Sequence, residues 1–290
     1  MIVDLNAATD FIHSTARLLD RHRLAHLRGD AGPEPVVQTL RAYRNPDGGF
    51  GHAIEPDMRA PVSQPVGVHT ALEILHEVGA NDDDLVGAAA DWLTTVTRDD
   101  GGIPFCLPSA ADYPRNPIWQ PADESSVIQT AANAAALHEV GSDHPWLKGA
   151  GEFVWRWLDE LDLDGAQATP GFGYEIRFAV VFLNAVPDAT RAEAALDRLA
   201  PHLFASGVVS REAGGDVQTP LDLAPLPDSR ARSMFSADDI ERDLDALEAA
   251  QHDDGGWMFA WDQWNAAATL EWRGVLTIRA LRLLAANGRT

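Results

Sequence analysis

Basic residues are scarce in this sequence. The chain has 22 lysines and arginines against 44 aspartates and glutamates, and its formal net charge is −22. Nucleic acids and anionic membrane surfaces both attract proteins through a positive patch, so this charge balance excludes them as expected partners. Lysine occurs once, at Lys148, which leaves no other lysine to form a Schiff base or to hold a phosphate.

Cysteine and long apolar runs are also scarce. The single cysteine, Cys106, rules out an intramolecular disulfide framework and a multi-cysteine metal site, and it suits a small buried side chain better than a catalytic thiol. No stretch approaches about 18 consecutive apolar residues, and the N-terminus lacks the regions of a signal peptide. The hydrophobic content of 46% still provides for a sizeable core. We therefore expect residues 1–290 to form one cytoplasmic domain without integral membrane association.

The sequence does contain a repeated turn. Asp-Gly-Gly followed by a large apolar residue occurs at Asp47–Phe50, Asp100–Ile103 and Asp254–Trp257, each time after the end of a helical pattern. The best copy is Leu247–Trp257, LEAAQHDDGGW. Glycine supplies the positive φ of a tight turn, and the apolar side chain folds back over the end of the helix. Three copies in the same spacing indicate a helical repeat protein.

Apolar residues recur at helical spacing between these turns. The predicted helices cover about 4–27, 33–43, 66–78, 125–140, 145–161, 174–186, 189–203 and 266–286, with two more that begin at 82 and 236 and a weak signal at 221–223. The number of residues between the aspartates at 100 and 254 is about three times the number between those at 47 and 100. Two degenerate units are therefore expected near Asp164-Gly165 and Gly214-Gly215.

Alternation of apolar and amphipathic helices predicts an all-α fold. In a ring, the apolar helices form an inner barrel and the amphipathic helices an outer layer, which gives an (α/α) toroid of five to six hairpins as a single domain. An open solenoid is the alternative, but such a solenoid needs polar capping repeats, and neither end of the chain has an obvious one.

The sequence resembles the terpenoid cyclase and protein prenyltransferase superfamily, whose members carry QW repeats on an (α/α) toroid. The likeness rests on Leu247-x3-Gln251-x3-Gly255-x-Trp257 and its two weaker copies. Two features depart from the superfamily. The Asp-x-Asp-Asp motif with which squalene-cyclase-like enzymes protonate an alkene is missing, and Cys106 lacks the aspartate two residues earlier that a prenyltransferase zinc site needs. We therefore expect no metal and no cofactor.

The candidate site lies in the loops that lead into the inner helices, because parallel inner helices gather these loops on one face. Carboxylates, guanidinium groups and aromatic rings over one concavity are typical of a small-molecule pocket. The candidate catalytic residues are Glu55, Asp57, Asp123 and Glu124. The candidate substrate-binding residues are His52, Arg59, Tyr113, Arg115, Trp119, Tyr174, Trp257, Trp261 and Trp264. Trp155 and Trp157 lie at helical spacing and are assigned to packing.

The resemblance favours a terpenoid-cyclase-like enzyme, an isomerase or lyase, with an isoprenoid substrate. In this interpretation Asp57 or Asp123, held protonated in an apolar pocket, starts cyclisation, and the loop tryptophans stabilise the carbocation through their ring faces.

Two alternatives stay open. Glu55 or Asp57 could pair with Asp123 or Glu124 as the two carboxylates of a carbohydrate-active hydrolase or lyase. The chain could also be a non-enzymatic scaffold that binds an apolar ligand. Oligomeric state does not follow from the sequence.

Overall fold

The computed structural model describes residues 3–163, 172–203 and 218–289, and this part of the chain is all-α apart from one short pair of strands. The α-helices are α1 (Leu5–Thr15), α2 (Leu18–Leu27), α3 (Glu34–Leu40), α4 (Pro65–Glu77), α5 (Asp83–Val96), α6 (Val127–Glu139), α7 (Trp146–Glu160), α8 (Phe172–Ala185), α9 (Ala189–Leu203), α10 (Pro220–Leu223), α11 (Ala237–Ala249) and α12 (Ala266–Ala286). Short 3₁₀ helices cover Arg41–Tyr43, Pro108–Ala110 and Arg230–Met234. Strand β1 (Ile103–Pro104) pairs antiparallel with β2 (Ser125–Ser126).

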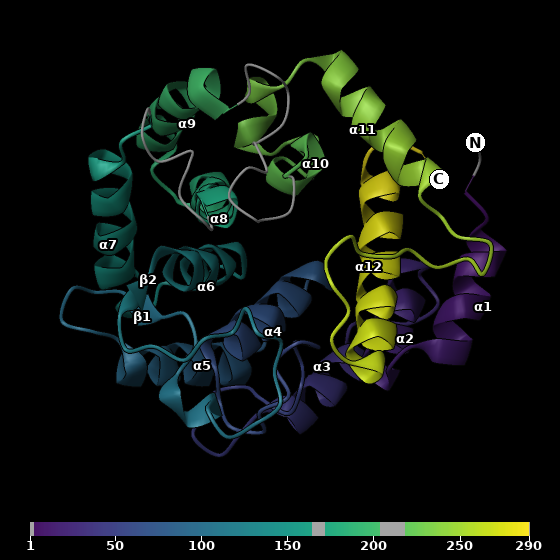
Figure 1. The fold of residues 1–290 in the computed structure, drawn as a ribbon, viewed down its shortest axis with the longest axis horizontal. Coiled ribbons are helices and arrows are strands. Elements are labelled where there is room, and N and C mark those ends of the chain that lie inside the picture. The colour runs from purple at the N-terminus through teal and green to yellow at the C-terminus, as the bar shows by residue number, and fades with distance from the viewer. Residues whose placement is uncertain (1–2, 164–171, 204–217, 290) are drawn as a thin grey trace.

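The helices lie in two layers around a common centre. Figure 1 shows the even-numbered helices nearer the centre and the odd-numbered helices outside them. Neighbouring even-numbered helices are in contact from α4 through α6 and α8 to α10, and α12 contacts α2. Ion pairs join the two remaining neighbours, Arg23 to Glu77 between α2 and α4, and Arg279 to Asp222 between α12 and α10. These contacts and ion pairs link each even-numbered helix to the next.

The three Asp-Gly-Gly turns have the same geometry. The first glycine has a positive φ in every copy, 93° at Gly48, 90° at Gly101 and 89° at Gly255. The aspartate carboxylate accepts the N–H of the second glycine at 3.0, 3.0 and 3.2 Å. The apolar residue that follows is buried in each copy, as Phe50, Ile103 and Trp257. The turn predicted from the sequence is confirmed.

Each turn packs against the backbone of the next outer helix. A Cβ on the first glycine of the turn would lie 2.2–2.7 Å from that backbone. The contacts are Gly48 with Ala88 of α5, Gly101 with Gly149 of α7, and Gly255 with Ala7 of α1. The third contact joins the turn after α11 to the first helix of the chain, so the same interface that links successive hairpins also links the last one to α1.

The position four residues before the first glycine anchors the start of the next outer helix. Gln251 exchanges two hydrogen bonds with the main chain of Asp4, the N-cap of α1, at 2.8 and 2.9 Å. Arg44 pairs with Asp84 in the first turn of α5 at 2.8 Å. The Thr97 hydroxyl accepts the indole N–H of Trp146, the first residue of α7, at 2.7 Å. Three different side chains therefore perform one structural task.

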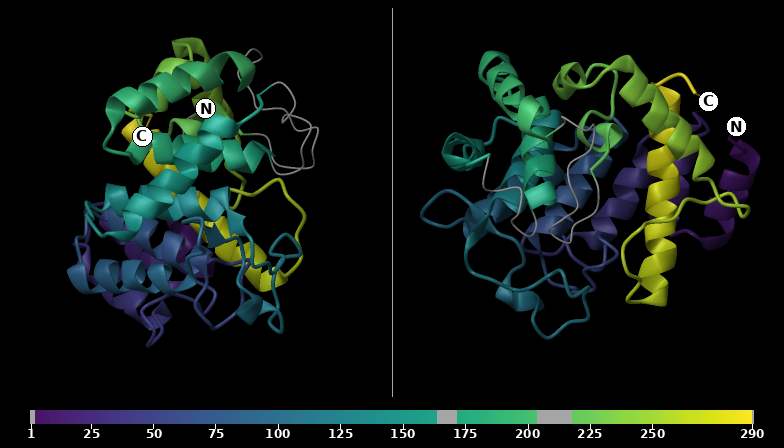
Figure 2. Two further views of the ribbon diagram at one scale, coloured as in Figure 1. Left: turned by 90° about the vertical axis from the view of Figure 1, so that its left-hand side faces the viewer. Right: turned by 45° about the horizontal axis from the view of Figure 1, so that its top comes forward.

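Two buried clusters form the main core. The larger runs from α2 through α9 and includes Phe50, Leu72, Leu137 and Phe182. The second joins α1, α11 and α12 and includes Trp257. The right-hand view in Figure 2 shows α12, in yellow, between purple N-terminal helices, in agreement with its contacts to α1 and α2.

One predicted helix is wrong in its extent. The pattern over 4–27 predicts one continuous helix, whereas α1 ends at Thr15 and α2 begins at Leu18. The break occurs because Arg17 takes an extended backbone conformation, and its guanidinium binds Asp20 and the carbonyls of Ala53 and Ile54. The carbonyls of Ala53 and Ile54 belong to a distant loop, and the break itself has no glycine or proline signal.

Other boundaries agree with the pattern. Helices 189–203 and 266–286 begin and end where predicted, and the weak signal at 221–223 corresponds to α10. The degenerate units expected near Asp164-Gly165 and Gly214-Gly215 lie outside the described residues. Within the described ranges, no helix is both long and apolar enough to cross a bilayer.

Candidate functional site

Three loops that lead into inner helices meet at Asp57. The loop before α4 forms a bridge between Met58 and Arg115 of the loop before α6. Next to this bridge, the N–H of Asn116 donates to the Asp57 carbonyl at 2.8 Å. The loop before α12 approaches from the other side, where the indole N–H of Trp264 donates to the Asp57 carboxylate at 2.5 Å. The loops before α4, α6 and α12 thus contact one another at Asp57.

Asp57 is a buried carboxylate held by aromatic and amide donors. Its residue surface is only 6% exposed, and besides Trp264 it accepts the side-chain amide of Asn116 at 3.3 Å. Burial raises the pKa of Asp57, and this rise is opposed by the N–H groups of Trp264, Trp272 and Asn116 and by the charge of Arg59. The carboxylate therefore keeps a proton to a higher pH than an exposed aspartate does.

Glu55 lies two residues earlier and is more strongly perturbed. It is 6% exposed, and its Oε2 atom has no hydrogen-bond partner among the described residues. Burial, and then the neighbouring charge of Asp57, raises the pKa of Glu55 well above its ordinary value. The backbone N–H groups of Met58 and Asp57 and the charge of Arg17 offset only part of this rise. The site thus favours a protonated carboxylic acid at Glu55.

The backbone just before Glu55 is strained. His52 and Ala53 have φ values of 56° and 60°, and they are the only non-glycine residues with positive φ in the part of the chain that the structure describes. Such conformations cost about 1 kcal/mol or more each and persist only where the surroundings impose them. Arg17 imposes this one by donating to the carbonyls of Ala53 and Ile54 at 3.2 and 2.8 Å. The exposed ring of His52 contacts Asn45.

Aromatic rings and one ion pair form the α12 side of the site. Trp261 stacks on Phe259 with ring centroids 4.4 Å apart and meets Trp272 edge-on at 5.3 Å. Arg59 pairs with Glu271 at 2.5 Å, which ties the loop before α4 to α12. Asp57 is therefore close to the indole rings of Trp264 and Trp272 and to the charge of Arg59.

Asp123 and Glu124 lie elsewhere. Both are exposed, and Asp123 forms an ion pair at 2.9 Å with Arg98 at the second Asp-Gly-Gly turn. Because water and salt screen an exposed charge, such a carboxylate has little electrostatic effect on groups other than its direct partner. The structure brings Glu55 and Asp57 together, and it does not bury Asp123 or Glu124 beside them.

Two other candidates have structural contacts. Arg115 donates to the carbonyls of Ala110, Ala111, Tyr113 and Trp119, and so holds its loop in shape. Trp119 is buried and stacks on Phe105 at 4.6 Å. It shares a small cluster with the buried Cys106, whose pKa is raised to about 11 by burial. The thiol is thus kept protonated, as its assignment to packing predicts.

The remaining candidates divide between core and surface. Trp257 is a core residue, and its indole N–H donates to the Leu247 carbonyl at 2.8 Å across the turn. Tyr113 is 36% exposed at the tip of its loop. Tyr174 is half-buried in the first turn of α8. The sequence did not single out Asn116 or Arg17, because neither residue type nor spacing marks them as partners of the loop before α4.

The inner faces of α2, α4 and α12 carry a buried chain of charges. Asp20 binds Arg17 at 2.8 Å and Arg23 at 3.0 Å, and Arg23 continues to Glu77 at 2.6 Å. Arg282 reaches the same Glu77 at 2.9 Å. Burial acts to raise the pKa of Asp20, but its two arginine partners outweigh burial and hold the pKa below its ordinary value. These charges therefore pair with one another between the three helices.

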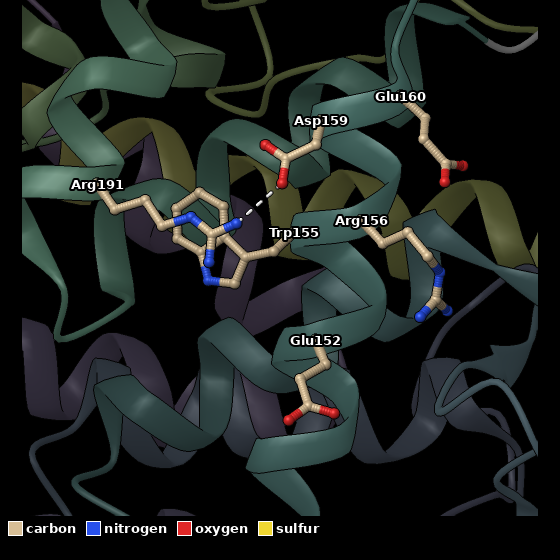
Figure 3. A pocket seen from close by; sticks show the side chains of 6 residues that line it. All are labelled: Glu152, Trp155, Arg156, Asp159, Glu160 and Arg191. Carbon is tan, nitrogen blue, oxygen red and sulfur yellow. Dashed lines mark hydrogen bonds and ion pairs between the residues drawn. The ribbon is translucent and has the colours of Figure 1, made fainter.

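A surface hollow between α7 and α9 has a different character. It has a volume of about 400 Å³ and is lined by Glu152, Trp155, Arg156, Asp159, Glu160 and Arg191. In Figure 3 the Arg191 guanidinium lies over the Trp155 ring, 4.0 Å from its centroid, and pairs with Asp159 at 3.0 Å. Trp155 also packs edge-on against Phe182 of the core. These contacts confirm the packing role assigned to Trp155.

In the described residues, no group of three or more histidine, cysteine or acidic side chains is placed to hold a metal ion. No protein-family model and no curated protein matches the sequence. A solved crystal structure of a protein from Actinoplanes is similar, with a TM-score of 0.58 and 17% sequence identity, over 97% of this chain and 98% of that chain. At this level of identity the likeness shows a shared fold along nearly the whole of both chains.

Proposed function

We propose that the chain is an (α/α) toroid enzyme that uses Glu55 and Asp57 as an acid–base pair on a small, polar, hydroxyl-bearing substrate, as a hydrolase or lyase. The closed succession of inner helices from α2 to α12 supports the toroid. The turn after α11 packs on α1 as the earlier turns pack on α5 and α7, which supports closure over an open solenoid.

The observation that carries the activity is the buried Glu55 carboxyl with a free oxygen and a raised pKa. Asp57, whose pKa is raised less because several N–H groups stabilise its charged form, is the first of the two to ionise. Paired carboxyls with different pKa values are the usual division into acid and base. Glu55 protonates the leaving oxygen as its bond breaks, and Asp57 takes the proton of the water that forms the new bond.

The strength of the acid favours this proposal over isoprenoid cyclisation. A raised pKa makes Glu55 a weak acid, which suits proton transfer to an oxygen leaving group near neutral pH. An alkene is a far weaker base and requires a strong acid. Terpenoid-cyclase-like activity stays a prediction that the same assay tests.

The test is a substrate screen with matched variants. The protein is incubated with aryl glycosides and oligosaccharides in one arm, and with prenyl diphosphates and polyprenes in the other, and products are identified by mass spectrometry. We expect turnover in the carbohydrate arm. Glu55→Gln and Asp57→Asn should each lower it by at least about 100-fold, because each removes one proton transfer. Glu193→Gln, an exposed carboxylate on α9, serves as the control and should leave turnover unchanged.

Turnover in the isoprenoid arm alone would support the cyclase instead. Absence of turnover in both arms, together with saturable binding of an apolar fluorescent probe, would support the non-enzymatic scaffold. Carbohydrate turnover that survives in Glu55→Gln would remove Glu55 from the mechanism.

A further inference from the structure

Each oxygen of the Asp57 carboxylate accepts a hydrogen bond from an uncharged donor. The indole N–H of Trp264 donates to Oδ1 at 2.5 Å, and the side-chain amide of Asn116 donates to Oδ2 at 3.3 Å. The two donors belong to different loops, those before α12 and α6. An indole N–H can only donate, and it binds an ionised carboxylate more strongly than a protonated one. The contact with Trp264 therefore favours the charged form of Asp57.

Glu55 has the same exposure as Asp57 but lacks such a donor. Both residues are 6% exposed. Within the described ranges no side chain donates a hydrogen bond to Glu55, and its Oε2 atom has no partner of any kind. The two carboxyls thus differ in the donors that other loops bring to them, and not in their exposed fraction.

The charged groups on the elements around Asp57 have other partners. Arg59, in the same loop, acts on Asp57 but forms its ion pair with Glu271 of α12 at 2.5 Å. Arg115, in the loop before α6, donates to main-chain carbonyls of its own loop. Arg17, the N-cap residue of α2, forms an ion pair with a carboxylate of that helix at 2.8 Å. The side-chain hydrogen bonds to Asp57 therefore come from uncharged groups.

Trp264 differs in its contacts from Trp261 of the same loop. Both tryptophans are half-buried. Trp261 packs through its ring, which stacks on Phe259 at 4.4 Å and meets Trp272 edge-on at 5.3 Å. Its indole N–H forms no hydrogen bond within the described ranges. The loop before α12 thus has one tryptophan that binds Asp57 through its N–H and one that packs, and the two can be compared.

We propose that Trp264 is a positioning residue, whose indole N–H keeps Asp57 as the ionised member of the carboxyl pair and leaves the proton on Glu55. In the proposed function this contact makes Asp57 the base and Glu55 the acid, so the role of Trp264 in catalysis rests on that function. The contact itself is a property of the folded protein and can be measured without a substrate.

The experiment is a double-mutant cycle by urea unfolding at about pH 4 and about pH 8, with Trp264→Phe, Asp57→Asn and the double variant. Trp264→Phe keeps an aromatic ring and removes the N–H. Its effect on the unfolding equilibrium constant should be at least about fivefold larger at the higher pH, because hydrogen bonds to charged groups are the stronger ones. In the Asp57→Asn background the effect should be equal at both pH values. Trp261→Phe is the control, and its effect should not depend on pH.

The direction of this change follows from the pKa of Asp57. Burial raises this pKa, and the N–H of Trp264 opposes the rise. In Trp264→Phe the folded-state pKa should be higher still. Stability that is lost as pH rises through a raised pKa is then lost to a greater extent than in the wild type. The two proteins should differ by a constant amount below the folded-state pKa of the wild type, and the difference should grow above it.

A second measurement needs no substitution of Trp264. In ¹H–¹⁵N NMR spectra, the indole signal of a tryptophan bound to Asp57 should shift as this carboxylate ionises. The chain has nine tryptophans. We expect at least one of their indole signals to titrate in the wild type and to stay constant in Asp57→Asn. The same titrating signals in both proteins would overturn the proposal.

An equal effect of Trp264→Phe at both pH values, or a pH dependence that persists in Asp57→Asn, would also overturn it, because the indole would then only pack. Failure of the acid–base function looks different, since the cycle then gives the expected result and the substrate screen gives no product. Where turnover is found, the acidic limb of kcat/KM should move to higher pH in Trp264→Phe, by at least about 0.7 unit. A limb that does not move would show that Trp264 does not control the base.

Discussion

Glu55 is a buried carboxyl with one oxygen that has no hydrogen-bond partner among the described residues. Most buried polar atoms in folded proteins have a hydrogen-bond partner, so an unpartnered carboxyl oxygen is a cost to stability. Here the cost occurs next to two residues with strained backbone, His52 and Ala53, and next to a second buried carboxyl, Asp57. Strain and desolvation concentrated within six residues are typical of a site maintained for chemistry.

The raised pKa of Glu55 predicts a pH-dependent stability. The folded protein holds this proton to a higher pH than the unfolded chain does. The free energy of unfolding therefore falls as pH rises from the ordinary pKa of 4.5 through the folded-state pKa, by at most about 1.4 kcal/mol per pH unit. Glu55→Gln cannot ionise and escapes this loss. We expect its free energy of unfolding to match that of the wild type at about pH 4 and to exceed it at about pH 8.

Urea unfolding at both pH values measures this difference. Glu193→Gln, which removes an exposed carboxylate, should not change the pH dependence. An equal effect of both variants, or a Glu55→Gln protein that is less stable at the higher pH, would contradict a protonated Glu55 in the folded state.

For single residues, the sequence predicts which loops carry the candidate side chains, but not which of these side chains are buried. Glu55, Asp57 and Trp264 were predicted because their loops precede inner helices, and the structure brings them together. Asp123 belongs to an equally suitable loop, yet it is exposed beside Arg98. Whether a loop side chain points inward depends on long-range contacts such as that of Arg17 with the carbonyl of Ala53, which no local pattern encodes.

The Asp-Gly-Gly turn is the element that positions the site. It ends an outer helix, sets the start of the next loop and rests on the following outer helix through a glycine that has no room for a Cβ. Three such turns were predicted from spacing alone, because positive φ and close backbone approach both require glycine and therefore leave a visible signal. The break between α1 and α2 left no such signal.

Replacement of Gly255 by alanine should be costly for two separable reasons. Positive φ costs about 1 kcal/mol for a residue with a Cβ, and here that Cβ would also lie 2.2 Å from the main chain of Ala7. Gly79 has a φ of 61° but nothing within 4 Å, so Gly79→Ala has only the first cost. We expect Gly255→Ala to be destabilised by at least about 2 kcal/mol more than Gly79→Ala in urea unfolding. Equal losses would show that the turn does not press on α1.

The whole molecule joins its two ends through the interface that it uses between internal hairpins. The turn after α11 lies on α1, Gln251 binds the N-cap of α1, and the second core cluster contains residues from α1, α11 and α12. A linear repeat array would leave its first and last helices with one free face each. In this chain α1, α11 and α12 pack against one another.

Circular permutation tests this closure. We join the two ends by a short glycine–serine linker and open the chain between Asn81 and Asp82, in the loop between α4 and α5. Because α1 already packs against α12, the permuted chain should keep one cooperative unfolding transition with an unchanged denaturant m-value. A chain opened between the buried residues Asn133 and Ala134 of α6 serves as the negative control and should not fold. A first permutant that unfolds in two steps, with α1, α11 and α12 melting separately, would show that the contact between the ends is not part of the cooperative unit.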